Sequence, residues 1–497
     1  MSDFLLGIDI GTTATKALLI NQNGEVIALA KQGYGIISSH NTWIEQNPKD
    51  WWDAIVKTVR RVVKDAKAKK RIKGISLSTQ GGTLIPVDSR GKPLRKAITW
   101  LDQRAEKQGE KLKEKFGDDF FYSRTGYRPR SSLPLLCIYW LKDNEPKLFK
   151  KASKFLFVND YIIYKLTGKY YTDPSNASIT MLYNLKLQNW DKQLLQIADI
   201  SREKLSEIKD SGVPIGKLTR LAAKTLNLSQ DIIVFSGGHD QYCASLGSGV
   251  FSNGDCLVSC GTAWVLLCSI GKAVFDIKSN IIPGRHVIKD KWGVMATISS
   301  GGLVIEWFKN NFGNDETNIY DLYDKKVKGI PAGSNNLLFF PHFIGSTAPT
   351  WQSSAKGALI GLTLSHTKCD IFKSIMEALG FEVLWNIEVI KRLGISIKKI
   401  KMTGGAIKNN LWPQIIADII GKRIFVFSVS EAACLGAAIL AGVGAGIFTN
   451  PKEGFEKLQI KEKEVIPSRD NTAKYRKLFQ IYKETFWKLQ DSYKSLR

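Results

Sequence analysis

The sequence predicts an α/β protein of two domains that face each other across a cleft. Two observations carry this prediction. Segments typical of strands and of helices alternate along the chain. In addition, a strand, a Gly-Thr turn and a second strand occur near the start of each half, at Gly11 and again at Gly261. This repeat indicates an internal duplication, with expected domains at residues 1–249 and 250–497.

Length and composition exclude several classes of protein. A chain of 497 residues with 44% hydrophobic and 24% charged residues is ordinary for a globular protein, which excludes disordered and collagen-like chains. Seven cysteines without a secretory leader do not indicate a disulfide framework. The longest apolar stretch, residues 434–448, contains four glycines and is shorter than the roughly 20 residues that span a bilayer. We therefore expect a cytoplasmic protein that makes no membrane contact.

The chain is strongly basic. It contains 71 Lys and Arg residues against 46 Asp and Glu residues, a formal net charge of +25. Nucleic-acid-binding proteins usually concentrate such an excess in a patch or a tail, whereas these lysines are spread along the chain. We expect a solvated, lysine-rich surface and no nucleic-acid partner. The positive field favours an anionic ligand such as a nucleotide.

The first thirty residues predict an antiparallel meander. Strands are expected at residues 4–9, 16–20 and 25–30, joined by Gly11-Thr12-Thr13 and by a turn at residues 21–24. A Rossmann unit would instead begin with a strand, a turn and a helix. Neither GxGxxG nor GxxxxGK[ST] occurs anywhere in the sequence, so neither of these common nucleotide-binding loops is present.

The remaining elements follow from periodicity and capping signals. Asn47 and Pro48 are typical of a helix start, and this helix is expected to reach about residue 68. Residues 103–230 are expected to be mostly helical, with loops at 127–132 and 172–178. Further strands are expected at 72–78, 232–236, 255–259, 264–270, 294–298, 337–340, 400–403 and 424–427. Further helices are expected after Asp240 and at 302–312, 370–393, 410–420, 431–445 and 472–496.

The first Gly-Thr turn is a candidate phosphate loop. Asp9 ends a strand, where a carboxylate can hold Mg²⁺ through water. Gly11 lets a phosphate approach the backbone, while the Thr12 and Thr13 hydroxyls and the turn N–H groups can bind its oxygens. A plain β-hairpin is the alternative interpretation. The second turn, Gly261-Thr262, favours the phosphate interpretation because two facing loops could bind one polyphosphate.

Asp240 is the candidate base. It follows Gly237-Gly238-His239 and stands where a strand gives way to a helix, so it could simply cap that helix. Alternatively, its carboxylate could accept the proton of a hydroxyl that attacks phosphorus. His239 beside it is expected to have a structural or supporting role.

Two other local patterns concern ligands. Gly404 and Gly405 could admit a flat adenine against the backbone, with Asn409 as a hydrogen-bond partner, although a helix-entry turn is the alternative. Cys256 and Cys260 are expected to be buried thiols rather than metal ligands. The five histidines show no metal-binding pattern.

These residues together resemble the FGGY family of carbohydrate kinases, over residues 5–446. The resemblance is most specific where Gly357-Ala-Leu-Ile-Gly-Leu is followed seven residues later by Asp370-Ile-Phe-Lys-Ser-Ile-Met-Glu. Trp43 to Pro48 and Trp100 to Arg104 also match landmarks of the family. The overall sequence pattern is most similar to that of the xylulose-kinase-like branch of the family.

The resemblance implies two ribonuclease-H-like (actin-like ATPase) domains, ATP and Mg²⁺ as cofactors, and Asp240 as the catalytic base. A homodimer is compatible with the family, although the apolar stripe of the last helix could equally pack internally. The implied acceptor contacts are Gln80, Gly81, Asp102, Asp240 and Gln241. The implied nucleotide contacts are Gly11, Thr12, Thr13, Lys16, Gly261, Thr262, Gly302, Glu306, Gly404, Gly405 and Asn409, with Asp9 at the metal through water.

Departures from the family pattern fall on the acceptor side. Xylulose kinases typically carry Met-His after the Gln at position 80, and glycerol kinases carry Arg-Glu, whereas this chain has Gly81-Gly82. Cys137 stands where a Lys is usual, and Gly345-Ser346-Thr347 stands where Gly-Glu-Arg is usual. We expect phosphorylation of a ketopentose such as xylulose. The alternatives are glycerol, gluconate, ribulose or fuculose as acceptor, and, more distantly, a non-catalytic actin-like nucleotide switch.

Overall fold

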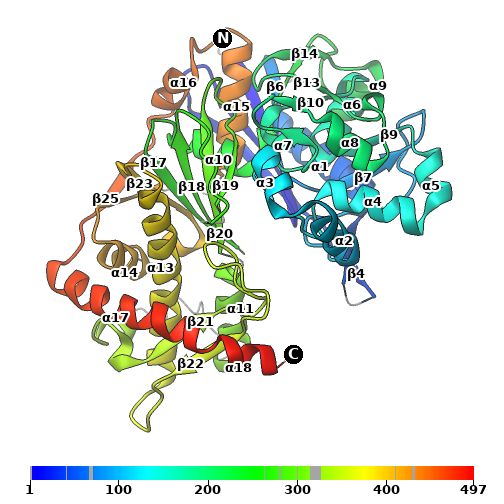
Figure 1. The fold of residues 1–497 in the computed structure, drawn as a ribbon. Helices are drawn as coiled ribbons and strands as arrows, with labels where there is room; N and C mark the ends of the chain where they lie inside the picture. The colour runs from blue at the N-terminus through cyan, green and yellow to red at the C-terminus, as the bar shows by residue number, and fades with distance from the viewer. Residues whose placement is uncertain are drawn as a thin grey trace.

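Two seven-stranded sheets dominate the computed structural model, one in each half of the chain (Figure 1). The structure describes residues 3–40, 42–66, 71–261, 263–278, 281–298, 300–313, 326–408, 410–427 and 431–496. Within these ranges the N-terminal sheet has the order β14-β15-β6-β1-β2-β3, with β16 also pairing with β6, and the C-terminal sheet has the order β19-β20-β18-β17-β23-β24-β25. The predicted α/β class with two domains is confirmed.

The N-terminal sheet begins with the predicted meander. Its strands are β1 (Phe4–Ile10), β2 (Ala14–Asn21), β3 (Val26–Gly33), β6 (Ile72–Thr79), β14 (Pro214–Lys217), β15 (Ile233–Phe235) and β16 (Gly238–His239). β1, β2 and β3 are antiparallel, whereas β6 runs parallel to β1, and both β15 and β16 run parallel to β6.

The C-terminal sheet repeats this arrangement. Its strands are β17 (Asp255–Cys260), β18 (Trp264–Ile270), β19 (Ile282–Arg285), β20 (Trp292–Ile298), β23 (Lys399–Gly404), β24 (Ile424–Phe427) and β25 (Glu462–Val465). β17, β18 and β20 form an antiparallel meander, and β23 and β24 continue the sheet in parallel with β17. The path β20-β18-β17-β23-β24 therefore matches β3-β2-β1-β6-β15, as the repeated Gly-Thr hairpin predicts.

Helices cover the sheets, and small sheets fill the connections. The helices of the N-terminal half are α1 (Pro48–Asp65), α2 (Glu106–Phe116), α3 (Asp118–Thr125), α4 (Pro134–Asn144), α5 (Pro146–Lys151), α6 (Val158–Thr167), α7 (Pro174–Ser178), α8 (Lys192–Ala198), α9 (Arg220–Leu226) and α10 (Asp240–Gly247). Those of the C-terminal half are α11 (Gly301–Phe312), α13 (Lys368–Arg392), α14 (Leu411–Ile420), α15 (Ala432–Gly444), α16 (Pro451–Lys457), α17 (Arg469–Lys488) and α18 (Gln490–Ser495). The small sheets contain β4 (Ile37–Ser39), β5 (Trp43–Gln46), β7 (Leu84–Val87), β8 (Ala97–Ile98) and β9 (Lys154–Phe157), and the pairs β10 (Tyr171–Thr172) with β13 (Glu207–Ile208), β11 (Tyr183–Asn184) with β12 (Asn189–Trp190), and β21 (Leu338–Pro341) with β22 (Gly357–Ile360).

Local capping chemistry explains where the sequence prediction holds and where it fails. Asn47 accepts a hydrogen bond from the Lys49 N–H, as predicted for the start of α1, although the helix ends at Asp65 rather than near residue 68. The loop predicted over residues 172–178 is wrong in part. Asp173 accepts hydrogen bonds from the Ser175 and Asn176 N–H groups and starts α7, with Pro174 in its first turn. Similarly, the single helix predicted at 472–496 is the pair α17 and α18.

The prediction of buried thiols is wrong for Cys256, which forms a disulfide with Cys268. The two residues face each other in the register of β17 and β18, and their Cα atoms are 4.1 Å apart. The two cysteines are 12 residues apart on opposite strands, so their pairing follows from the hairpin register and not from the short spacing between Cys256 and Cys260. Cys260 is a buried free thiol, as predicted.

Helix α15 comes from the C-terminal half but packs against strands β1 and β6 of the N-terminal sheet, and Figure 1 shows it beside β6. Glycine makes this approach possible, because a Cβ on Gly7 of β1 would overlap the Cys434 carbonyl oxygen. Helix α10 crosses α15 equally closely. A Cβ on Gly247 would overlap the Ala432 carbonyl, and one on Gly436 would overlap the Cys243 carbonyl. The predicted boundary between residues 249 and 250 places the two sheets in different domains. Helices α10 and α15 lie on opposite sides of this boundary in the sequence, yet they pack against each other.

The apolar stripe of the C-terminal helix packs inside the domain. Tyr475, Phe479, Tyr482 and Phe486 of α17 are buried, and the Tyr482 hydroxyl donates a 2.7 Å hydrogen bond to Glu382 of α13. His342 Nε2 lies 3.6 Å from the same carboxylate. Burial raises the pKa of Glu382 to about 7, while burial lowers the pKa of His342 to about 3.

Glu382 predicts a pH dependence of stability. The folded protein keeps this carboxyl protonated up to about pH 7, whereas the unfolded chain ionises it near its ordinary pKa of 4.5. Protonated Glu382 therefore makes its full contribution to the free energy of unfolding below pH 4.5. This contribution is lost as the pH rises to about 7, and the loss is roughly 3 kcal/mol because one pKa unit corresponds to about 1.4 kcal/mol. We expect Glu382→Gln to unfold with a smaller difference in free energy between pH 5 and pH 8 than the wild type in urea titrations. Equal differences would contradict this assignment.

Candidate active site

The candidate residues of the first half meet at one edge of the N-terminal sheet. β1, β6 and β16 are parallel, so their carboxyl ends lie together. The turn at Gly11 follows β1, Gln80 follows β6, and Asp240 follows β16. The Gln80 N–H donates a 2.9 Å hydrogen bond to the Ile10 carbonyl, which ties the first two segments directly.

Asp9 is buried beneath the first turn. It is 7% exposed, and Ser78 Oγ donates a 2.8 Å hydrogen bond to its Oδ1. Lys16 lies opposite Asp9 in the β1–β2 register, and its Nζ forms a 2.6 Å ion pair with Glu431, which immediately precedes α15. Burial raises the pKa of Asp9 to about 6, because the charge of Lys16 only partly offsets the loss of water.

Asp240 occupies the first turn of α10. His239, not Asp240, is the residue at the N-cap position, so the capping alternative does not describe this carboxylate. Burial raises the pKa of Asp240 to about 6, opposed by the backbone and side-chain amides of Gln241 and by the charge of Lys16. The buried carboxylate of Asp9 and the partly exposed carboxylate of Asp240 thus share the field of Lys16.

The chemistry of this set fits a hydrated Mg²⁺ bound together with phosphates. In the described part of the chain no three His, Cys, Asp or Glu side chains form a metal cage. Mg²⁺ keeps several waters and usually needs one or two carboxylates besides the substrate phosphates. Burial is the main cause of the raised pKa values of Asp9 and Asp240, so a nearby cation would favour the ionised form of both carboxylates.

A chain of amides connects Gln80 to the first turn. Gln80 Nε2 donates to Gln46 Oε1 at 2.9 Å, and Gln46 Nε2 donates to the Thr12 carbonyl at 2.7 Å. Trp100 Nε1 donates to Thr12 Oγ1 at 3.0 Å. Gln80 Oε1 is buried and has no partner among the described residues, so it is fixed in place and able to accept a hydrogen bond from an acceptor hydroxyl. Sequence reasoning assigned no role to Gln46 or Trp100, although both stand in the quoted family landmarks.

Asp102 is placed differently from the other predicted acceptor contacts. It is fully buried, its Oδ1 accepts hydrogen bonds from the backbone and Nε of Arg104, and its Oδ2 accepts from the Ile44 N–H at 2.6 Å. Arg104 also pairs with Glu45 and lies 4.0 Å over the Trp43 ring. In this structure Asp102 therefore orients Arg104 and is not open to an acceptor.

Three candidate residues of the second half, Gly261, Gly302 and Gly404, lie near the end of β17 in the C-terminal sheet. Gly261 follows β17, and the Gly302 N–H donates to the Gly261 carbonyl at 3.1 Å. Gly404, at the end of β23, has φ +102°, and a Cβ there would overlap the Cys260 carbonyl. Gly405 and Glu306 are exposed. Thr262 and Asn409 lie outside the described residues.

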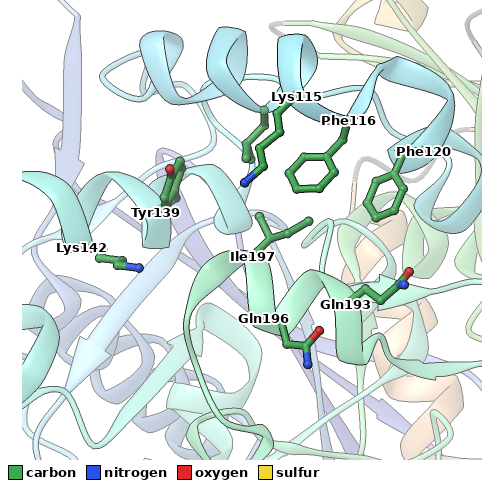
Figure 2. Close-up of a pocket in the computed structure, with 9 residues that line it drawn as sticks. Lys115, Phe116, Phe120, Tyr139, Lys142, Gln193, Gln196 and Ile197 are labelled. Atoms are coloured by element: carbon green, nitrogen blue, oxygen red, sulfur yellow. The ribbon is translucent and has the colours of Figure 1, made fainter.

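A hollow in the N-terminal half contains none of these residues. It lies between α2, α3, α4 and α8, where Phe116 and Phe120 point toward Ile197 (Figure 2). Lys115, Tyr139 and Lys142 stand around it. The candidate active site is therefore defined by the strand ends and their turns, not by this hollow.

Comparison with known proteins decides the family. Two models, the N-terminal and C-terminal domains of the FGGY family of carbohydrate kinases, match residues 4–247 and 256–445. The chain belongs to the FGGY family of carbohydrate kinases. Kinases of this family use ATP. None of the helices described here is long and apolar enough to cross a membrane.

Individual FGGY kinases match along their full length but differ in their acceptors. The xylulose kinase of Bacillus subtilis (strain 168) is 32% identical over 98% of this chain and 97% of its own length. The gluconokinase of the same strain is 29% identical over 97% of this chain and 95% of its own length. The crystal structure of a gluconate kinase from Lactobacillus acidophilus superposes with a TM-score of 0.93 at 28% identity, with both chains fully covered.

The two adjacent glycines of the adenosine candidate offer a matched pair of variants. Gly404→Ala places a Cβ against the Cys260 carbonyl at a positive φ, whereas the nearest neighbour of a Cβ on Gly405 is the same carbonyl oxygen at 3.8 Å. We expect Gly404→Ala to lower the free energy of unfolding by about 1–3 kcal/mol and to weaken ATP binding. Gly405→Ala should change stability by less than about 0.5 kcal/mol. Thermal unfolding and ATP titration check both, and equal effects would contradict the close approach at Gly404.

Proposed function

We propose that this FGGY kinase transfers the γ-phosphoryl group of ATP to a hydroxyl of a small sugar or polyol, and that the acceptor is a ketopentose such as xylulose. One observation carries the reaction: an ionisable carboxylate, Asp240, starts a helix at the same sheet edge as the Gly11 turn. The xylulose kinases among the relatives support the ketopentose.

Asp240 would act as the general base. Its pKa of about 6 leaves the carboxylate ionised near pH 7, so it can orient the acceptor hydroxyl and take its proton as the oxygen attacks phosphorus. Gln80 Oε1, held by Gln46, would accept a hydrogen bond from another acceptor hydroxyl. Gln241 follows Asp240 on α10 and is half-buried, within reach of the same region.

The phosphates would lie between the two Gly-Thr turns. The Gly11 N–H closes the first turn on the Ala14 carbonyl at 3.0 Å, and Thr12 and the exposed Thr13 within this turn would bind the γ-phosphate. Lys16 stays bound to Glu431 and supplies positive charge near Asp9. Mg²⁺, when bound, neutralises charge on the phosphates, and Asp9 would hold it through water. The C-terminal turns at Gly261 and Gly404 would bind the other side of the nucleotide.

Replacement of Asp240 tests the base directly. Asp240→Asn keeps the size of the side chain but cannot take the proton, so kcat should fall by about 10²–10⁴ while the affinity for ATP stays close to that of the wild type. Steady-state ADP release and ATP titration measure the two quantities. Unchanged turnover would contradict the role of Asp240. The melting temperature of the variant controls for folding.

A panel of acceptors tests the substrate. ADP release with Mg²⁺-ATP is measured for ketopentoses, aldoses, alditols, glycerol and sugar acids. Stimulation greatest with a ketopentose would support xylulose or a related sugar. Stimulation greatest with glycerol or an acid would reassign the chain within the FGGY kinases. ATP binding without stimulation by any acceptor would favour a nucleotide switch.

A sugar acid such as gluconate is the second candidate acceptor, and Arg130 favours it. Arg130 lies in the loop before α4, is an exposed residue, and forms no ion pair with another described residue. Its guanidinium lies 4.6 Å over the ring of Trp351 from the C-terminal half. A cation held at this junction between the two halves could bind a carboxylate.

Arg130→Gln separates the two candidates. If the acceptor is an acid, loss of the charged hydrogen bond should raise KM for the acid roughly tenfold or more and leave KM for neutral acceptors unchanged. The neutral acceptors in the same panel serve as the control. Equal effects on acids and neutral sugars would exclude carboxylate recognition by Arg130.

A further inference from the structure

His239 stands between the base and the Gln80 segment. It ends β16 and lies opposite Thr79 in the parallel register with β6, one residue before Gln80. Its backbone N–H donates a 2.9 Å hydrogen bond to Ser175 Oγ of α7, the short helix that the sequence did not predict. The next residue is Asp240. The position of the His239 backbone is therefore fixed from two sides at the candidate site.

The imidazole of His239 occupies the space that a side chain at position 81 would need. A Cβ on Gly81 would overlap His239 Cδ2 and would lie 2.7 Å from Nε2 and 3.0 Å from Ile179 Cγ2. On its other side the ring packs edge-to-face with Tyr242, at a centroid distance of 5.9 Å. Gly81 and His239 are thus complementary, and the ring cannot move toward Gly81 without losing this packing.

The ring is neutral and has unused hydrogen-bonding capacity. Burial lowers the pKa of His239 to about 4, despite the opposing negative charge of Asp173. Its Nδ1 is buried without a partner among the described residues, and its Nε2 lies 3.4 Å from Asp240 Oδ1. A neutral imidazole next to a carboxylate base adds a polar contact without neutralising the base.

We propose that His239 is a specificity-determining residue of the acceptor site, where its imidazole hydrogen-bonds the hydroxyl next to the one that Asp240 deprotonates. Position 81 is glycine because the ring takes its space. This inference rests on the proposed kinase function. His239, at the junction of β16 and α10, supplies a polar contact that Gly81 and Gly82 cannot supply because they have no side chains.

The test compares the preferred acceptor with its analogue that lacks the adjacent hydroxyl. The wild type should prefer the complete acceptor in kcat/KM by roughly twofold to tenfold, the range expected of one neutral hydrogen bond. His239→Ala should raise KM for the complete acceptor and bring this ratio close to one, while KM for ATP stays unchanged. His239→Asn, which keeps an amide, should retain part of the ratio.

Two variants that carry Gly81→Ala distinguish a loss of acceptor recognition from a loss of folding stability. Gly81→Ala should displace the ring and lower the same ratio. Gly81→Ala combined with His239→Ala should recover the melting temperature but not the ratio, because the clash is removed together with the imidazole. His342→Ala is the matched control, since His342 is 4% exposed against 5% for His239 but packs against α17 residues in the C-terminal half.

The outcomes are distinct. An active wild type whose ratio is unchanged in His239→Ala would overturn the role of His239 and leave the kinase function standing. A His342→Ala variant that loses the ratio as strongly as His239→Ala would also overturn it, because the effect would then reflect stability alone. A wild type that phosphorylates no acceptor of the panel would overturn the proposed function and this inference with it.

Discussion

The architecture of the site depends on two carboxylates of raised pKa, Asp9 and Asp240, that share the field of one lysine. Asp9 lies near the end of β1 and Asp240 follows β16, two strands that both pair with β6, and burial raises the pKa of each carboxylate to about 6. Lys16 lies opposite Asp9 and is held at 2.6 Å by Glu431. A hydrated cation bound here would offset the effect of burial, because a nearby positive charge favours the ionised form of each carboxylate.

Glu431 can reach Lys16 only because helix α15 lies directly against the first strand. That approach requires Gly7 on β1, and the crossing of α10 and α15 requires Gly247 and Gly436, since a Cβ at any of these positions would overlap a backbone carbonyl. The same helix pair connects the two sheets, and α10 begins with Asp240. A movement of the C-terminal half relative to the N-terminal half would therefore displace Asp240 and the Lys16–Glu431 ion pair directly.

The parts of the molecule that sequence could predict are those encoded in short stretches. The Gly-Thr hairpins, the start of α1 at Asn47 and the helix after Asp240 depend on turn and capping residues close together in the chain, and the structure contains all of them. The disulfide between Cys256 and Cys268 depends on the register across a hairpin. The burial of Asp102 under Arg104 depends on Ile44 and Glu45 from another strand. Contacts of this kind join segments that are separated in the sequence, so no local sequence pattern reveals them.

This difference explains why the family was easier to infer than the acceptor. The proposed nucleotide side consists of two local turns repeated by duplication, so each copy supports the interpretation of the other. The proposed acceptor side is assembled from single residues of separate segments: Gln46 and Gln80 share a hydrogen bond, Trp100 donates one to Thr12, and His239 fills the space beside Gly81. A glycine at position 81 looks like a missing contact in the sequence, whereas in the structure it makes room for an imidazole. Acceptor specificity in such a site is therefore a property of complementary pairs, and it changes when either member of a pair changes.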